Sequence, residues 1–164
     1  VGHIAAVREV SSERRFIVTA GGTDGTVRIW NRDPATQNYR QVQQISSTGG
    51  VSVETARISQ DEEMLVVGFS NGTIIILANT RRDVPFVSIQ TMLEAHPNGV
   101  LATAISSDSS KLVSIGKDGV PSYWVKPALN TPFNRIKKLQ EDANAVDFDR
   151  RNNIAVGVRE GNGS

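Results

Sequence analysis

The chain of 164 residues contains no cysteine and carries a formal net charge of only +1. The lack of cysteine excludes a disulfide framework, a thiolate metal site and a cysteine nucleophile. The near-zero charge argues against a protein that coats nucleic acid or an acidic membrane surface. No run of about 18 apolar residues occurs, so the sequence predicts no membrane insertion. There is also neither an initiator methionine nor a secretory signal pattern, as expected of a chain cut from a longer one.

A glycine turn recurs in the sequence every 47 residues. Its three copies are Asp24-Gly25-Thr26, Asn71-Gly72-Thr73 and Asp118-Gly119-Val120. Asp-Gly and Asn-Gly favour hairpin turns of type I′, because these residues accept positive φ angles. Self-similarity at this period predicts a repeat architecture that stacks hairpin-built sheets.

Each period contains four short strand patterns and no helical pattern. The predicted strands are Ile4–Val10, Phe16–Ala20, Thr26–Asn31, Tyr39–Ile45, Val53–Ile58, Met64–Phe69, Thr73–Ala78, Pro85–Leu93, Val100–Ser106, Lys111–Ile115, Val120–Val125, Asn134–Leu139, Ala145–Phe148 and Asn153–Val158. This pattern predicts an all-β fold of four-stranded antiparallel blades. The expected blades are residues 1–47, 48–95 and 96–142, with 143–164 as the start of a fourth.

The residues around the turns resemble a known family. The first unit begins with Gly2-His3 and reaches Trp30, and the third begins with Ala95-His96 and reaches Tyr123-Trp124. This pattern is similar to that of the WD-repeat β-propeller family, whose repeat opens on Gly-His and closes on Trp-Asp. The resemblance implies a partial ring, about three and a half blades of seven or eight.

In that family a buried His, Ser, Asp and Trp form a hydrogen-bonded tetrad that locks each blade. By the family's spacing, the third unit has all four members: His96, Ser114, Asp118 and Trp124. The first unit keeps three members and has Ala20 for the serine: His3, Asp24 and Trp30. The second unit has Gly49 or Gly50, Val67, Asn71 and Leu77 at these positions. Because a buried polar set must be satisfied or absent, we expect an apolar second blade and a water or backbone group near Ala20.

Pro121 falls inside a predicted strand with neighbours on both sides. Proline cannot donate to the ladder, so the sequence predicts a bulge or an unpaired carbonyl at this point.

Three and a half blades leave two blade faces uncovered. Burying about 400 Å² of apolar surface on each would contribute about 10 kcal/mol, so we expect the chain to be part of a larger ring. The alternative is a half-ring that closes against a second copy or another chain.

The side chains that could do chemistry have a structural interpretation. His3 and His96 belong to different units, and no third ligand has the spacing of a zinc site. Ser, His and Asp occur together only in the tetrad, without the glycine-rich elbow of a nucleophilic serine. The glycine-rich stretch 21–25 joins two strands and opens no helix, so it is a turn and not a phosphate loop. The sequence therefore predicts no catalytic residue, metal or cofactor.

Arginine pairs occupy loops that emerge on one face of the blades. They are Arg14, Arg15, Arg81, Arg82, Arg150 and Arg151. Acidic residues share these loops, which favours a mixed, solvated surface. Alternatively, the arginines grip acidic or phosphorylated segments by bidentate contacts. The opposite face, with the glycine turns, has an acidic lean and favours a basic peptide.

The predicted function is a non-catalytic scaffold for protein–protein interaction within a larger intracellular complex, and this step rests on the family resemblance. One alternative is the non-catalytic propeller of an enzyme complex. Another is an RNA-associated propeller that uses the arginine-bearing face, although nucleic acid is the less favoured partner. We expect a location in the cytoplasm or on the cytoskeleton or cilium rather than in the nucleus.

Overall fold

The computed structural model describes residues 5–10, 15–22, 24–47, 49–79, 85–128, 131–139, 142–149 and 151–158, without the side chains of 5–10 and 158. The strands in chain order are β1 (Ala5–Val10), β2 (Phe16–Gly21), β3 (Thr26–Arg32), β4 (Tyr39–Ser46), β5 (Val53–Ile58), β6 (Met64–Phe69), β7 (Ile74–Ala78), β8 (Val87–Met92), β9 (Val100–Ile105), β10 (Lys111–Gly116), β11 (Pro121–Val125), β12 (Asn134–Lys138), β13 (Ala143–Phe148) and β14 (Ile154–Val158). The predicted strand bounds agree with these to within two residues.

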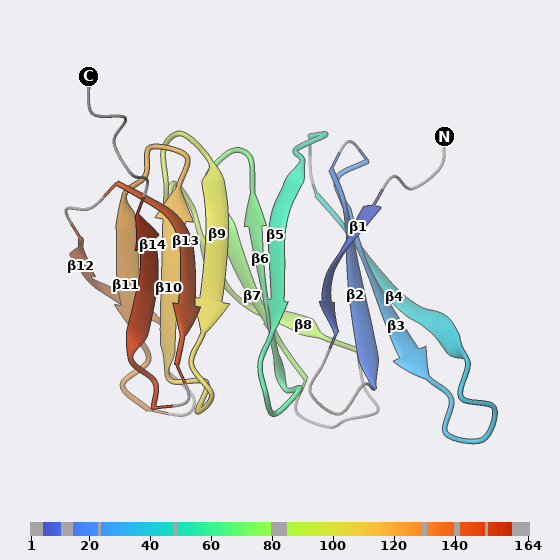
Figure 1. Cartoon of the computed structure of the whole chain (residues 1–164). Helices are drawn as coiled ribbons and strands as arrows, with labels where there is room; N and C mark the ends of the chain where they lie inside the picture. Colours follow the sequence, from blue (N-terminus) through green and yellow to red (C-terminus); the bar gives the residue numbers. More distant parts are fainter. Residues whose placement is uncertain are drawn as a thin grey trace.

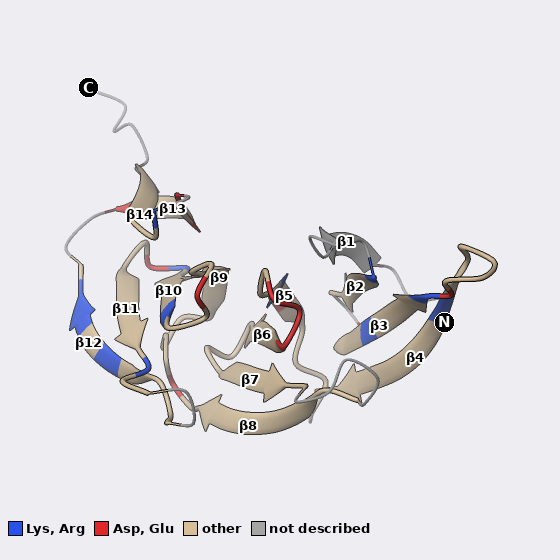
Figure 2. Ribbon diagram, turned by 90° about the horizontal axis from the view of Figure 1, so that it is seen from below, with Lys and Arg blue, Asp and Glu red and all other residues tan. Residues whose placement is uncertain are grey.

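The strands form three antiparallel four-stranded sheets and a two-stranded sheet, each in sequential order. We call the four-stranded sheets blades 1, 2 and 3. The sheets stand side by side along an arc, with β5 and β9 on its inner side and β4, β8 and β12 on its outer side (Figures 1 and 2). The predicted all-β fold of antiparallel blades in a partial ring is therefore confirmed. Among the described residues, no helix is long and apolar enough to cross a bilayer.

The hydrophobic core lies between sheets rather than inside any one of them. One cluster joins blades 1 and 2, a second joins blades 2 and 3, and a third joins blade 3 to the β13–β14 sheet. Strand β6 is buried along its whole length, and its side chains contribute to both the first and the second cluster. Each blade is thus stabilised by the apolar surface that it buries against its neighbours.

The glycine turns differ from the expected type I′ turn. That type needs positive φ at both central residues, but only glycine has it here: Gly72 at 83° and Gly119 at 76°, and not Asn71 or Asp118. The Asn71 and Asp118 side chains instead accept the backbone N–H two residues on, at 3.0 and 3.1 Å. Asn or Asp therefore suits this position because its side-chain oxygen accepts a backbone hydrogen bond, and not because it tolerates positive φ.

The glycine of each turn is also required by a close approach of the chain. The segment that leads into the next sheet crosses over the turn, and His96 N–H donates to Gly72 O at 3.2 Å. The N–H groups of Ser47 and Ala143 donate in the same way to the carbonyls of Gly25 and Gly119, at 2.8 and 2.9 Å. A Cβ atom at position 72 would lie 1.7 Å from the carbonyl oxygen of His96. No side chain fits there.

A glutamine clamp joins neighbouring blades at the outer edge, a feature that the sequence did not suggest. The Gln43 side chain of β4 accepts the Phe86 N–H at 2.9 Å and donates to the Phe86 carbonyl at 2.7 Å. Gln90 of β8 binds Phe133 of blade 3 in the same way, at 2.8 and 2.9 Å. Each carboxamide thus satisfies both polar groups of one backbone residue in the next blade.

Each outer strand carries a β-bulge at the same register position. The unpaired residues are Val42 in β4, Ile89 in β8 and Ile136 in β12. The bulge in β12 lies opposite Tyr123 and Trp124 rather than at Pro121, and blades 1 and 2 have the same bulge without a proline, so this bulge is not the one expected from Pro121. Pro121 is the first residue of β11, where its missing N–H is tolerated, and its carbonyl accepts the Leu139 N–H at 2.9 Å.

Replacing Gln43 with leucine should lower the free energy of unfolding by about 1–3 kcal/mol, since two hydrogen bonds to a partly buried backbone are lost. Chemical denaturation measures this effect. Gln44→Leu is the matched control, because Gln44 is exposed on the same strand. An equal loss in both variants would contradict a stabilising role of the clamp.

Candidate functional site

In blade 3 a buried hydrogen-bond chain links three side chains from different segments. His96 precedes β9, Ser114 lies in β10 and Trp124 lies in β11. The His96 Nε2 atom is 2.8 Å from Ser114 Oγ, and the Trp124 indole N–H donates to the same oxygen at 2.8 Å. Ser114 has no exposed surface. Its hydroxyl is therefore a bridging group inside the blade and is out of reach as a nucleophile.

Asp118, the fourth residue of the implied tetrad, lies at the exposed end of this chain. Its carboxylate and His96 Nδ1 both face Gly116, where an added Cβ would lie 2.4 and 2.7 Å from them. Burial lowers the pKa of His96 to about 4, although the Asp118 charge opposes the shift. The imidazole is therefore neutral at physiological pH, as a structural hydrogen-bonding group should be.

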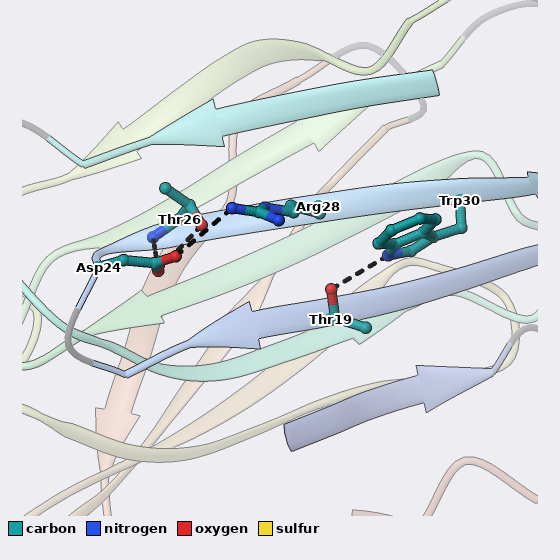
Figure 3. A network of polar contacts seen from close by, with 5 residues as sticks. All are labelled: Thr19, Asp24, Thr26, Arg28 and Trp30. Carbon is teal, nitrogen blue, oxygen red and sulfur yellow. Dashed lines mark hydrogen bonds and ion pairs between the residues drawn. The ribbon is translucent and has the colours of Figure 1, made fainter. Parts of the chain in front are cut away.

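Blade 1 has a hydrogen bond of the same kind from a different residue. The Trp30 indole N–H donates to Thr19 Oγ1 at 3.1 Å (Figure 3). At the turn, Asp24 accepts the Thr26 N–H at 3.0 Å and the Thr26 hydroxyl at 2.9 Å, and Arg28 lies 3.7 Å from its other oxygen. His3 lies outside the described residues.

The assignment of Ala20 to the serine position was therefore wrong. Trp30 is paired across the hairpin with Ile17, as Trp124 is with Leu112, so the serine position two residues further on is Thr19. The β2–β3 turn is one residue longer than the β10–β11 turn. The position four residues before Asp24, Ala20, is therefore one residue too late and lies on the opposite face of the strand from Thr19.

Blade 2 contains no polar network at these positions. Val67 and Leu77 replace the serine and the tryptophan, and both are buried in the cluster between blades 1 and 2. The three blades thus show either a satisfied polar group or a fully apolar substitute.

Ser114→Ala should lower the free energy of unfolding by about 2–4 kcal/mol, because two buried donors or acceptors lose their partner. Thr19→Val keeps the side-chain shape and removes one hydrogen bond, so about 0.5–1.5 kcal/mol is expected. Denaturant titration of both variants tests the difference. A larger loss for Thr19→Val would contradict the corrected register.

Stability should also depend on pH through His96. Its pKa falls from 6.5 to about 4 on folding, so the unfolded chain binds more protons between these values. The free energy of unfolding should therefore decrease as the pH is lowered from 6.5 to 4. His96→Gln should show a weaker pH dependence in that window than the unchanged protein. Equal slopes would exclude His96 as the source.

Of the six arginines proposed as interaction residues, the structure describes two. Arg14, Arg81, Arg82 and Arg150 lie outside the described residues. Arg15 Nε is 3.7 Å from the Glu62 carboxylate, and its guanidinium lies over the Phe16 ring at 5.5 Å. Glu62 is 2% exposed. Arg15 thus holds blades 1 and 2 together, which leaves it poorly placed to grip a phosphorylated ligand.

Arg151 lies in an exposed turn closed by Asp149, whose carboxylate accepts the Arg151 N–H at 2.8 Å. The same carboxylate is bound by Asn153, and these hydrogen bonds lower the pKa of Asp149. A stable negative charge therefore accompanies Arg151, in agreement with the mixed, solvated surface expected from the sequence.

The loops between the first two strands of each sheet are joined by a repeated contact. In the three fully or largely described loops, β5–β6, β9–β10 and β13–β14, one residue has positive φ and reaches back to the preceding loop. Glu62 approaches Arg15, the Ser109 hydroxyl donates to Asp61 at 3.1 Å, and Asn152 accepts from Ser107 at 2.7 and 2.9 Å. The side chain at this strained position thus forms a contact that glycine could not form.

The glycine-turn face has an ion pair between blades. Lys117 Nζ lies 2.8 Å from Glu54 Oε1, so part of the acidic lean of this face is neutralised within the protein. Within the described residues, no group of three or more His, Cys, Asp or Glu side chains could hold a metal ion.

The outer edge of the arc displays most of the exposed large hydrophobic side chains. Of the six among the described residues, five lie on or directly after an outer strand: Val42, Val87, Ile89, Leu93 and Ile136. Val42, Ile89 and Ile136 are the bulged residues and are 43%, 55% and 59% exposed. We call these three residues the rim row. They place one aliphatic side chain at the same outer position of every blade.

Comparisons with known proteins agree with this architecture. Residues 1–31 match the family model "WD domain, G-beta repeat". The chain is 28% identical over 138 residues to "WD repeat-containing protein 91 homolog" of Dictyostelium discoideum, and 29% identical over 153 residues to "Protein HIR1" of Phaeosphaeria nodorum (strain SN15). These alignments cover 84% and 87% of this chain but only 16% and 14% of the two relatives.

Two solved structures share the fold. A crystal structure of a protein from Lactobacillus plantarum matches with a TM-score of 0.69 and 15% identity, over 84% of this chain and 42% of the other. A chain of the crystal structure of the mitotic checkpoint complex matches with a TM-score of 0.65 and 18% identity, over 87% and 40%.

Proposed function

Because this chain belongs to the WD-repeat family, we propose that it is a non-catalytic platform that holds partner proteins in a larger assembly. WD-repeat proteins are generally protein-interaction scaffolds. The chain spans 16% of one relative and 14% of the other, so the activity and partners of a longer protein belong to the proposal. An intracellular location, in the cytoplasm or on the cytoskeleton or cilium, is part of it too.

The rim row carries this proposal. Single exposed aliphatic residues are common on protein surfaces, but here the exposure repeats at one structural position in three blades. An outer strand displaces this residue from the ladder by a bulge and thereby aims it away from the core. Burying such side chains against a partner would stabilise a complex by about 1.5–3 kcal/mol each.

The polar side chains inside the blades support a non-catalytic role. Ser114 Oγ is bound by both His96 and Trp124, and Thr19 Oγ1 is bound by Trp30. A catalytic base needs a pKa near the working pH, whereas burial lowers that of His96 to about 4. These groups hold the blades together and leave binding to the surface.

A photo-crosslinking amino acid placed at Val42 or Ile89 tests the platform. In cells that express the full-length protein containing this chain, both positions should give discrete adducts with other proteins. Ala35, exposed in the β3–β4 loop, is the control and should give fewer.

Identical adduct patterns from Ala35 and the rim row would contradict the proposal. Adducts removed by ribonuclease rather than by protease would favour the RNA-associated alternative.

A further inference from the structure

We propose that Asn98 is a site of spontaneous deamidation in the folded protein, and that its conversion to isoaspartate loosens the contact between blades 2 and 3. This modification site goes beyond the platform function and does not depend on it. Asn98 lies in the segment between β8 and β9, which links two complete four-stranded blades. It is followed by glycine, and its side chain is exposed.

Deamidation of an asparagine before a glycine needs no enzyme, oxidant or reductant. The backbone nitrogen of the glycine loses its proton and attacks Cγ of the asparagine side chain. A five-membered succinimide ring forms, the Cγ–Nδ2 bond breaks, and ammonia leaves with that proton. Water then opens the ring at either carbonyl and gives aspartate or isoaspartate. Glycine favours the reaction because no Cβ atom hinders the approach of its nitrogen.

The sequence contains three Asn-Gly pairs, and the structure describes two of them. Asn71 and Asn98 are both exposed, whereas Asn162 lies outside the described residues. In both described pairs the nitrogen that would attack is held by a hydrogen bond. Gly72 N–H donates to Phe69 O and Gly99 N–H donates to His96 O, each at 3.0 Å. The attacking nitrogen therefore does not distinguish the two pairs.

The carboxamide group that is attacked does distinguish them. Asn71 Oδ1 accepts the Thr73 N–H at 3.0 Å, and Asn71 must give up this hydrogen bond to react. Among the described residues, none holds the Asn98 side chain by a hydrogen bond. One hydrogen bond of ordinary net strength changes an equilibrium about two- to tenfold. Asn98 should therefore react faster than Asn71 by about this factor.

The reaction proceeds from a briefly opened turn. Residues 96–99 form a four-residue turn that is closed by the hydrogen bond from Gly99 N–H to His96 O. Ring closure breaks this bond, because the nitrogen must approach the side chain instead. Pro97 and Asn98 are exposed in the middle of the turn, and an exposed turn opens at a smaller free-energy cost than a whole blade. The folded protein can therefore reach the reactive conformation.

Isoaspartate at position 98 would lengthen the main chain at the point where the two blades meet. Its main chain runs through Cβ and Cγ and so contains one more methylene group. There is no space for it, since a Cβ atom added to Gly99 would lie 2.5 Å from Ser70 O. Gly99 O also accepts the Lys117 N–H at 2.9 Å. The extra methylene group must therefore displace Gly99 from Ser70 of blade 2 or from Lys117 of blade 3.

The same displacement acts on the buried histidine. His96 donates its N–H to Gly72 O at 3.2 Å, and its carbonyl accepts the Gly99 N–H. Its ring contacts Ser114 inside blade 3. Aspartate at position 98, in contrast, keeps the length of the main chain and adds only a charge at an exposed position. Isoaspartate is therefore the product that disturbs the contact between the blades.

Ageing of the full-length protein that contains this chain tests the site. The protein is incubated at mildly alkaline pH, once folded and once in concentrated urea, and peptide mass spectrometry follows the conversion of Asn71 and Asn98. In urea the two sites should react at similar rates, because both precede glycine. In the folded protein Asn98 should react about two- to tenfold faster than Asn71. Asn98→Gln keeps a carboxamide but cannot form the five-membered ring, so position 98 should stay unmodified in this control.

Hydrogen exchange tests the effect on the blades. The isoaspartate form is separated by chromatography and compared with Asn98→Asp, which has the charge without the longer main chain. Exchange in the peptide that contains Lys117 should be at least tenfold faster in the isoaspartate form, because the hydrogen bond to Gly99 O is lost. Asn98→Asp should exchange as the unchanged protein does.

Equal rates at Asn71 and Asn98 in the folded protein, or faster conversion of Asn71, would overturn the proposed site. So would the absence of product at Asn98 in the folded protein after the urea sample has been fully converted. Equal exchange in the isoaspartate form and in Asn98→Asp would overturn the loosening of the contact between the blades.

Discussion

The fold depends on the passage of each linking segment directly over the glycine of the preceding hairpin turn. At Gly72 the carbonyl of His96 occupies the space where a side chain would begin, and the two backbones share a hydrogen bond. The turn must therefore combine positive φ with the absence of a Cβ atom, which only glycine provides. This contact fixes where one sheet ends and the next begins, and it explains why glycine recurs with the period of the blades.

Around that crossing, the sheets are joined at three levels. Apolar clusters fill the space between them, the glutamine clamps join their outer edges, and the loops on the face opposite the glycine turns contact one another through residues with positive φ. The clusters bury apolar surface that one blade cannot cover, the clamps satisfy backbone polar groups, and the loop contacts are hydrogen bonds at Ser109 and Asn152 and an ion pair at Glu62. Because the contacts described between elements of different sheets connect neighbouring sheets, the arc behaves as a linear stack of similar units.

In this arrangement, the side chains that stabilise the blades differ from those that are exposed for binding a partner. The buried histidine and serine of blade 3 are engaged with each other and with tryptophan, and Arg15 is engaged with Glu62. What faces outward is a repeated aliphatic row. Such a distribution suits recognition by contact.

Much of the fold followed from the sequence. The period of the Asp-Gly and Asn-Gly turns and the apolar alternation gave the strands and their grouping, because turn chemistry and side-chain alternation are local properties. The apolar character of blade 2 was likewise visible in Val67 and Leu77. The resemblance to the family's tetrad placed Ser114 and Trp124 at corresponding points of their strands.

The failures occurred where a position depends on another part of the chain. Ala20 was mistaken for the serine position because one additional residue in a turn changes the strand register, and register is set by pairing. Pro121 was expected to cause a bulge or to leave a carbonyl unpaired, whereas blades 1 and 2 form the bulge in their outer strands without a proline. The clamp of Gln43 and the engagement of Arg15 were not visible, because their partners belong to the next blade. The sequence by itself thus determined the strands and turns, which depend on neighbouring residues. Only the tertiary structure decided which side chains form contacts between blades and which face outward, because side chains become buried only when the blades stack.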